Sequence, residues 1–102
     1  MKDISAETWK EDVLDQPLVL VDFWAPWCGP CKTMLPILEQ VENEIPNVQV
    51  VKVNADEHPD LVDQFEIKSI PTMMLYKEGE HVWTLTGGKP FGMLVEHLAP
   101  FI

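Results

Sequence analysis

Cys28 and Cys31 are the residues of this chain best suited to do chemistry, and they are its only cysteines. Two residues separate them, so their sulfurs can close a small disulfide ring without a large backbone movement. They follow a strongly apolar run, Leu18 to Phe23, and precede a stretch with helical apolar spacing, Met34 to Ile45. A thiol pair in that place is a redox site, a metal site or a structural crosslink, and the choice decides the function.

The structural and metal interpretations of the pair are both weak. A disulfide stabilises by closing a loop, and so short a loop gives only about 2 kcal/mol in the chain-entropy model. Structural zinc takes four ligands, and the chain has no second cysteine pair. Its histidines, His58, His81 and His97, are scattered and lack ligand spacing. We therefore expect a redox pair, with no metal and no bound cofactor other than a Cys28–Cys31 disulfide.

A helix that begins near Cys28 would favour the ionised form of this thiol. The unpaired amide groups and the dipole at a helix amino end stabilise a thiolate, which is the attacking form of sulfur. Cys31 would face back into the first turn and be more buried, so its task would be to attack the mixed disulfide that Cys28 forms with a substrate. Gly29 allows another backbone to approach closely, and Pro30 suits a first helical turn.

Two charged residues interrupt the apolar strands. Asp22 lies six residues before Cys28, and burial would raise the pKa of its carboxyl toward neutrality, where a proton shuttle works best. We hypothesise that Asp22 takes the proton from Cys31; the alternative is an exposed carboxylate that caps a turn. Lys52 interrupts a second apolar strand, either as an ion partner for Asp22 or as a lysine whose ammonium group reaches water.

Pro71 follows Ile70 directly before a predicted strand. Proline removes a donor from the strand ladder, and a cis bond at this place would be rare enough to imply a purpose. A plain turn proline is the alternative from the sequence alone.

The composition bounds the class of protein. The chain has 102 residues, of which 46% are hydrophobic, enough for the core of one domain over residues 1–102. Its net charge of −10, with no arginine, argues against binding of nucleic acid. No apolar run is long enough to predict a membrane span, and the first residues lack the order of a secretory signal. We therefore expect a cytoplasmic location, where a thiol pair is more often catalytic than structural.

The remaining pattern predicts helices that alternate with strands. Ser5 is the expected N-cap of a first helix, whose apolar face holds Trp9 and Val13. Pro36 lies inside the second helix and should kink it, and Pro90 suits the first turn of the last. The expected strands cover 18–23, 48–54, 73–77 and 81–86, and the expected helices cover 28–44, 59–65 and a segment from 90 to 100. With a short edge strand at 1–4, this order predicts an α/β fold with a mixed sheet and helices on both faces.

Taken together, these residues resemble the thioredoxin family over essentially the whole chain. A bare pair of cysteines two residues apart is a weak signal, whereas the full combination of motifs is highly specific. In the family's order and spacing, the chain carries Val21-Asp22-Phe23-Trp24-Ala25, Trp27-Cys28-Gly29-Pro30-Cys31-Lys32, Pro36, Lys52-Val53-Asn54, Ser69-Ile70-Pro71-Thr72, Lys77-Glu78-Gly79 and Gly87.

The resemblance implies the thioredoxin fold, with a mixed central sheet of four to five strands and helices on both faces. It implies a general protein-disulfide reductase in which Cys28 is the nucleophile and Cys31 the resolving thiol. It also implies that Asp22 is the buried acid, with Lys52 beside it, and that Pro71 is cis and lies against the disulfide.

The resemblance further implies how the chain meets its partners. Electrons would come from a thioredoxin reductase and pass to disulfide-containing client proteins, and the chain would act as a monomer without nucleic acid or membrane. Trp24 and Pro36 would support the active turn. The substrate-docking surface would comprise Trp27, Gly29, Pro30, Ile70, Pro71 and Gly87.

Two other functions stay open from the sequence. One is an oxidase or isomerase, against which the Gly29-Pro30 dipeptide argues, because oxidising members of the family usually carry a histidine there. The other is a docking subunit of a larger assembly in which the apolar rim binds a partner and the redox pair is idle.

Overall fold

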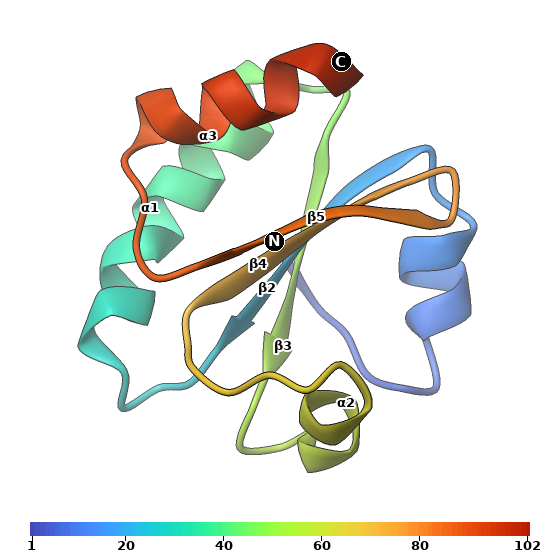
Figure 1. Ribbon diagram of the computed structural model, residues 1–102, viewed down its shortest axis with the longest axis vertical. Coiled ribbons are helices and arrows are strands. Elements are labelled where there is room, and N and C mark those ends of the chain that lie inside the picture. Colours follow the sequence, from blue (N-terminus) through green and yellow to red (C-terminus); the bar gives the residue numbers. More distant parts are fainter.

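The computed structural model describes residues 1–102, and its centre is a single mixed sheet (Figure 1). The five strands are β1 (Lys2–Asp3), β2 (Leu18–Trp24), β3 (Gln49–Asn54), β4 (Thr72–Lys77) and β5 (Glu80–Thr86). They lie in the order β1-β3-β2-β4-β5; β1, β3 and β2 are parallel, whereas β4 pairs antiparallel with β2 and with β5. The predicted mixed sheet is confirmed, and the short edge strand does form.

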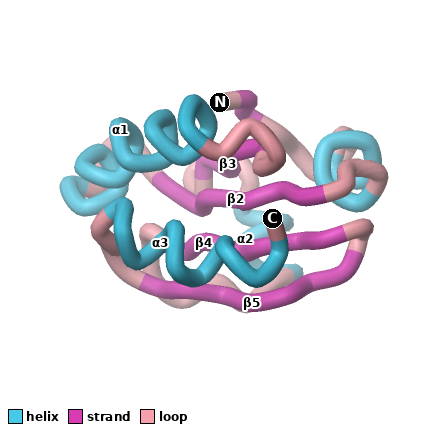
Figure 2. The backbone as a smooth tube through the Cα atoms, turned by 90° about the horizontal axis from the view of Figure 1, so that it is seen from above, coloured by secondary structure: helices cyan, strands magenta, loops and turns pink.

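The helices cover both faces of the sheet. They are the α-helices α1 (Gly29–Glu44), α2 (Pro59–Gln64) and α3 (Phe91–Leu98), the five-residue π-helix η1 (Lys10–Leu14) and the 3-10 helix η2 (Ala99–Phe101). Buried residues of α1 and α3 join one core cluster, and those of η1 and α2 join the other. Figure 1 shows α1 and α3 together on one side and η1 on the opposite side, and Figure 2 shows β3, β2, β4 and β5 in succession between them.

Strand β2 lies in the middle of the sheet and is buried along almost its whole length. Successive side chains of a strand point to opposite faces, so its apolar run serves both cores. Val19, Val21 and Phe23 pack on the η1 side, whereas Leu18 and Leu20 pack on the α1 side. Even-numbered residues of β2 therefore face α1, and Asp22 is one of them.

Helix α1 follows β2 after a short turn and brings both cysteines to the end of that strand. Cys28 is its N-cap, and Pro30 occupies the first turn, where a missing amide hydrogen costs nothing. The predicted apolar stripe is confirmed, since Met34, Leu38 and Val41 are buried against the sheet. The helix continues through Pro36 to Glu44 without a break.

The β4–β5 hairpin turns at Glu78 and Gly79, which both take left-handed backbone angles, φ 51° and φ 82°. A Cβ atom at position 79 would lie 3.0 Å from the backbone oxygen of Leu14, so glycine is needed there for space as well as for φ. The hairpin predicted from the sequence is confirmed, and it places β5 at the far edge of the sheet.

Two predictions about helix ends are wrong. Ser5 caps no helix with its side chain; its amide donates to the Thr8 hydroxyl at 3.2 Å in a turn, and η1 begins only at Lys10. The chain there closes a five-residue hydrogen bond from the Asp15 amide to the Lys10 carbonyl at 2.8 Å, so a regular α-helix does not form. Pro90 is the N-cap of α3 rather than part of its first turn, because its extended backbone lies outside the helix.

Candidate active site

Cys28 and Cys31 form a disulfide at the amino end of α1, with Cα atoms 5.2 Å apart. The Cys31 amide donates a hydrogen bond to Cys28 Sγ at 3.2 Å, so this sulfur occupies the place of a helix-capping acceptor. Cys28 is 5% exposed, whereas Cys31 is wholly buried, as predicted. A partner molecule that reaches the pair therefore meets the Cys28 sulfur first.

The loop before β4 lies against this disulfide. The Ile70–Pro71 peptide bond is cis, and the Ile70 carbonyl oxygen lies 3.9 Å from Cys28 Sγ. Gly87, at the end of β5, donates its amide to the Pro71 carbonyl at 2.8 Å, which joins it to the same loop. Ile70 also packs, with Trp24, against the small cluster of Ala25, Cys28 and Cys31. The fold thus brings together three segments that are far apart in the sequence.

The surface beside the disulfide is apolar and hollowed on two sides. Trp27 is 69% exposed, and its indole Nε1 donates to Asp56 at 2.8 Å. A hollow of about 270 Å³ beside it is lined by Trp27, Ala55, Val62, Ile67, Lys68, Ser69 and Ile70. A second, of about 380 Å³, is lined by Pro30, Thr33, Met34, Ile37, Gly88, Lys89 and Pro90. Because an exposed apolar patch marks an interaction surface, the two hollows give the site room for side chains of a partner.

Asp22 lies wholly buried on the α1 side of the sheet. Neither of its carboxylate oxygens has a hydrogen-bond partner. Burial raises the pKa of the Asp22 carboxyl from 3.8 to about 7, and the charge of Lys52 offsets part of that rise. A carboxyl with a pKa near 7 is partly protonated at neutral pH, unlike an ordinary aspartate.

Lys52 lies opposite Asp22 in the register of β3 and β2, but the two side chains form no ion pair. Its ammonium nitrogen lies 3.7 Å from an Asp3 carboxylate oxygen and 4.7 Å from the centre of the Trp24 ring. The direct Lys52–Asp22 pair considered from the sequence is therefore absent. Lys52 prefers Asp3 because pairing with a carboxylate that is 65% exposed costs less hydration than pairing with the buried Asp22.

No group of three or more histidine, cysteine, aspartate or glutamate residues is placed to hold a metal ion. Nor is any helix both long and apolar enough to cross a membrane.

Comparison with known proteins decides the family. The thioredoxin family model matches residues 1–100. The chain belongs to the thioredoxin family. It is similar to the thioredoxin of Synechocystis sp., with 44% identity over 97% of this chain and 94% of that protein. Thioredoxin 1 of Synechococcus elongatus is 45% identical over 85% of this chain and 83% of its own length.

A solved structure supports the same assignment. The structure of Plasmodium falciparum thioredoxin superposes with a TM-score of 0.91 and 31% identity, and the match covers 100% of both chains. The thioredoxin fold implied by the sequence is thus confirmed. With its cysteine pair bonded at the amino end of α1, the chain is a thiol-disulfide oxidoreductase with protein-disulfide reductase activity.

The sequence alone missed two contacts of this site. Asp56 holds the indole of Trp27, and Asp3 holds the ammonium group of Lys52. Neither aspartate stands out in the sequence, because each lies in a polar segment and meets its partner only through the fold. Alternation along β3 places Lys52 on the α1 side, but it does not say which carboxylate binds it.

Proposed function

We propose that this thioredoxin-family protein reduces disulfides of client proteins, with Cys28 as the nucleophile and Cys31 as the resolving thiol. The observation that carries the assignment is the position of Cys28 Sγ as the N-cap acceptor of α1, with some exposure, while Cys31 is wholly buried beneath it. A sulfur in that place is held as a thiolate by the amide groups and dipole of the helix.

The reaction has two exchanges. The Cys28 thiolate attacks one sulfur of a client disulfide, forms a mixed disulfide and releases the other client sulfur as a thiolate that takes up a proton. Cys31 then loses its proton and attacks Cys28 Sγ, which closes the Cys28–Cys31 disulfide and releases the second client thiol. Two electrons pass from the cysteine pair to the client in each cycle.

Asp22 is the proposed acceptor of the Cys31 proton. It lies on the α1 side of the sheet, and a carboxyl with a pKa of about 7 can both take and return a proton at neutral pH. Its lack of any hydrogen-bond partner supports this role, because a carboxylate fixed by donors would hold its charge and resist protonation.

The client segment is proposed to dock in extended form over the loop before β4. Ile70 would offer its backbone to the segment, as a strand edge does, while the cis Pro71 and Gly87 shape the same wall. Trp27, with Gly29 and Pro30, would cover the client's side chains from the α1 side. Trp24 and Pro36 would support the turn without touching the client.

The partners follow from the family. We propose that a thioredoxin reductase returns two electrons to the Cys28–Cys31 disulfide after each cycle. We also propose that the chain acts as a monomeric single domain, residues 1–102, in the cytoplasm.

Turnover of insulin disulfides with a small dithiol as electron donor tests the proposed roles. Cys28→Ser is expected to lower the rate at least about a thousandfold, because the attacking sulfur is lost. Cys31→Ser is expected to accumulate a covalent complex with insulin, visible on non-reducing gels after thiols are blocked. Glu39→Gln, an exposed change on the same helix, is the control and should keep the wild-type rate. Turnover by Cys28→Ser near the wild-type rate would contradict the assignment, and so would the absence of a covalent complex with Cys31→Ser.

A further inference from the structure

Three charged residues form a row across the first three strands of the sheet. Asp3 of β1 is in register with Lys52 of β3, and Lys52 is in register with Asp22 of β2. Residues in register on neighbouring strands point to the same face, here the face that α1 covers. One ammonium group therefore stands between two carboxylates.

The two carboxylates differ in solvent exposure and in their interaction partners. Asp3 is 65% exposed and holds the Lys52 ammonium nitrogen at 3.7 Å. Asp22 is wholly buried, and its oxygens have no partner. The ammonium group also lies over the Trp24 ring at 4.7 Å, and the Lys52 side chain is 17% exposed. Lys52 thus points along the row toward Asp3.

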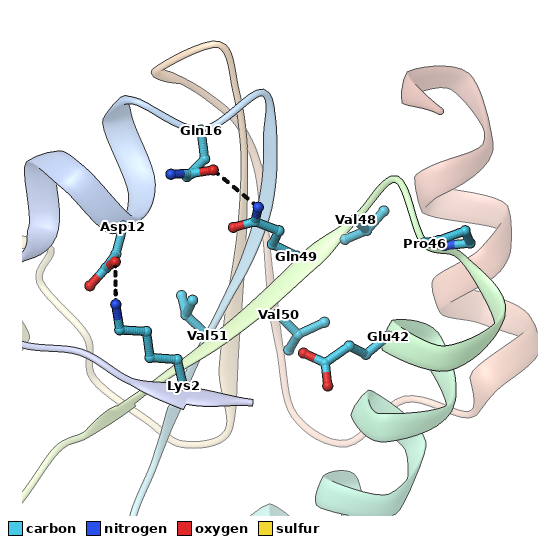
Figure 3. A pocket seen from close by; sticks show the side chains of 9 residues that line it. All are labelled: Lys2, Asp12, Gln16, Glu42, Pro46, Val48, Gln49, Val50 and Val51. Atoms are coloured by element: carbon cyan, nitrogen blue, oxygen red, sulfur yellow. Dashed lines mark hydrogen bonds and ion pairs between the residues drawn. The ribbon is translucent and has the colours of Figure 1, made fainter.

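Contacts made by the residues on either side fix the position of Asp3, although β1 has only two residues. The neighbouring Lys2 reaches the opposite face and donates to Asp12 of η1 at 2.8 Å, as Figure 3 shows. The Ile4 amide donates to the Lys52 carbonyl at 2.9 Å, and the amino group of Met1 lies 3.4 Å from Glu42. Because β1 is anchored before and after it, the Asp3 carboxylate has a defined place beside Lys52.

We propose that Asp3 is a positioning residue for the disulfide-reducing reaction, and that it holds the Lys52 ammonium group on the water side so that Asp22 forms no ion pair. Without Asp3, the flexible lysine side chain turns toward the one other carboxylate in its row. The charged form of Asp22 is then stabilised by an opposite charge at short range, and the group holds a proton less readily.

No other charge competes for this effect. Among the elements packed around Asp22, β4 contributes Met73 in register and β5 contributes Leu85 beyond it. The buried residues of the covering helices are Cys31, Met34, Leu38 and Val41 from α1, with Leu94 and Leu98 from α3. Lys52 is the one titratable group whose charge acts on Asp22.

A double-mutant cycle on the oxidised protein tests the proposal. The pH titration of Asp22 is followed by the infrared band of its protonated carboxyl, assigned by its loss in Asp22→Asn. Asp3→Asn is expected to lower the midpoint by about one pKa unit from about 7, a tenfold change in proton affinity. In a Lys52→Met background the same change should leave the midpoint where Lys52→Met alone puts it, because there is no lysine left to move.

Matched variants separate positioning from simple loss of charge. Asp3→Glu keeps a carboxylate and should keep the wild-type midpoint, whereas Asp3→Gln should behave like Asp3→Asn. Glu42→Gln removes an equal charge that binds the chain's amino group rather than Lys52, and should not shift Asp22. An unshifted midpoint in Asp3→Asn and Asp3→Gln, or a shift that persists in the Lys52→Met background, would overturn the proposal.

The consequence for the reaction rests on the proposed role of Asp22, and a second readout keeps the two apart. The pH profile of client release from the mixed disulfide should move with the infrared midpoint, about one unit lower in Asp3→Asn. If the infrared midpoint moves and the pH profile does not, Asp3 positions Lys52 as proposed, and it is the role of Asp22 as proton acceptor that fails.

Discussion

The α1 side and the η1 side of the sheet each hold a mostly buried aspartate. The pKa values of the two carboxyls are shifted in opposite directions from the ordinary value. On the α1 side, Asp22 has no hydrogen-bond partner, and burial raises the pKa of its carboxyl to about 7. On the η1 side, the side chain of Asp12 is 12% exposed and receives a hydrogen bond from Lys2 at 2.8 Å. That bond, more than any other cause, lowers the pKa of the Asp12 carboxyl.

The difference between these two regions shows that burial alone does not set what a carboxyl can do. Removal from water disfavours the charge in both places, but a cation supplied at hydrogen-bond distance outweighs that cost at Asp12. Asp12 is therefore a fixed charge that anchors β1, whereas Asp22 is a group that can change its protonation near neutral pH. The same sheet keeps a structural carboxylate and a titrating one, and the placement of two lysines distinguishes them.

The difference between the two aspartates should be greatest in the stability of the fold. The folded state keeps a proton on Asp22 up to about pH 7, whereas the unfolded chain loses it near pH 3.8. The contribution of Asp22 to the free energy of unfolding therefore falls as the pH rises from about 3.8 to about 7, and it is constant above that range. Asp22→Asn removes this loss and should stabilise the fold by about 4 kcal/mol at pH 8, and hardly at all at pH 3. Urea unfolding at both values measures the difference. An equal effect at the two pH values would show that Asp22 has an ordinary pKa.

The next effect is on catalysis. Asp22→Asn should slow release of the client from the mixed disulfide by about a hundredfold at pH 7, because Cys31 then loses its proton acceptor. Asp12→Asn should leave this rate unchanged, since Asp12 belongs to the other side of the sheet. Single-turnover release of a fluorescent client, followed over pH, compares the two variants. Equal rates in Asp22→Asn and the wild type would remove Asp22 from the reaction.

The weakest effect is expected on the η1 side of the sheet, at Asp12. Asp12→Asn should destabilise the fold by about 1 kcal/mol at neutral pH, because an ion pair with a mostly exposed lysine is lost. The sign is opposite to that of Asp22→Asn. Because the pKa of Asp12 is lowered in the folded state, its carboxylate stabilises the fold above pH 3.8, and this stabilisation is lost as the pH falls through the folded-state pKa. The loss of stability in Asp12→Asn should therefore vanish in acid. Thermal unfolding at pH 7 and pH 2 checks it, and a deficit that persists in acid would contradict the account.

Local sequence patterns carry most of the fold and half of the site. The apolar run at β2 predicted a central strand, and a charge inside it predicted the buried Asp22. The proline and the helical spacing after Cys28 indicate a helix start there, and Cys28 is the N-cap of α1. These predictions succeeded because each depends on residues only a few positions apart.

What the sequence could not give depends on contacts across the fold. Asp3 and Lys52 are far apart in the chain, and only the register of β1 on β3 brings them together. Trp27 and Asp56 meet between two loops, whose path no periodic pattern encodes. The prediction of Ser5 as an N-cap is wrong because it also depends on packing across the fold. Trp9 and Val13 pack in the core as predicted, but the backbone that carries them forms a π-helix that begins only at Lys10.

Alkylation of the reduced protein decides whether one sulfur is held ionised at the amino end of α1 while the other is buried beneath it. The rate of modification of each cysteine by iodoacetamide is followed by mass spectrometry from pH 5 to pH 10. Cys28 is expected to react first and already at neutral pH, well below the range of an ordinary thiol, while Cys31 stays protected. Equal modification of both cysteines, rising only near pH 8.5 as for free thiols, would contradict it.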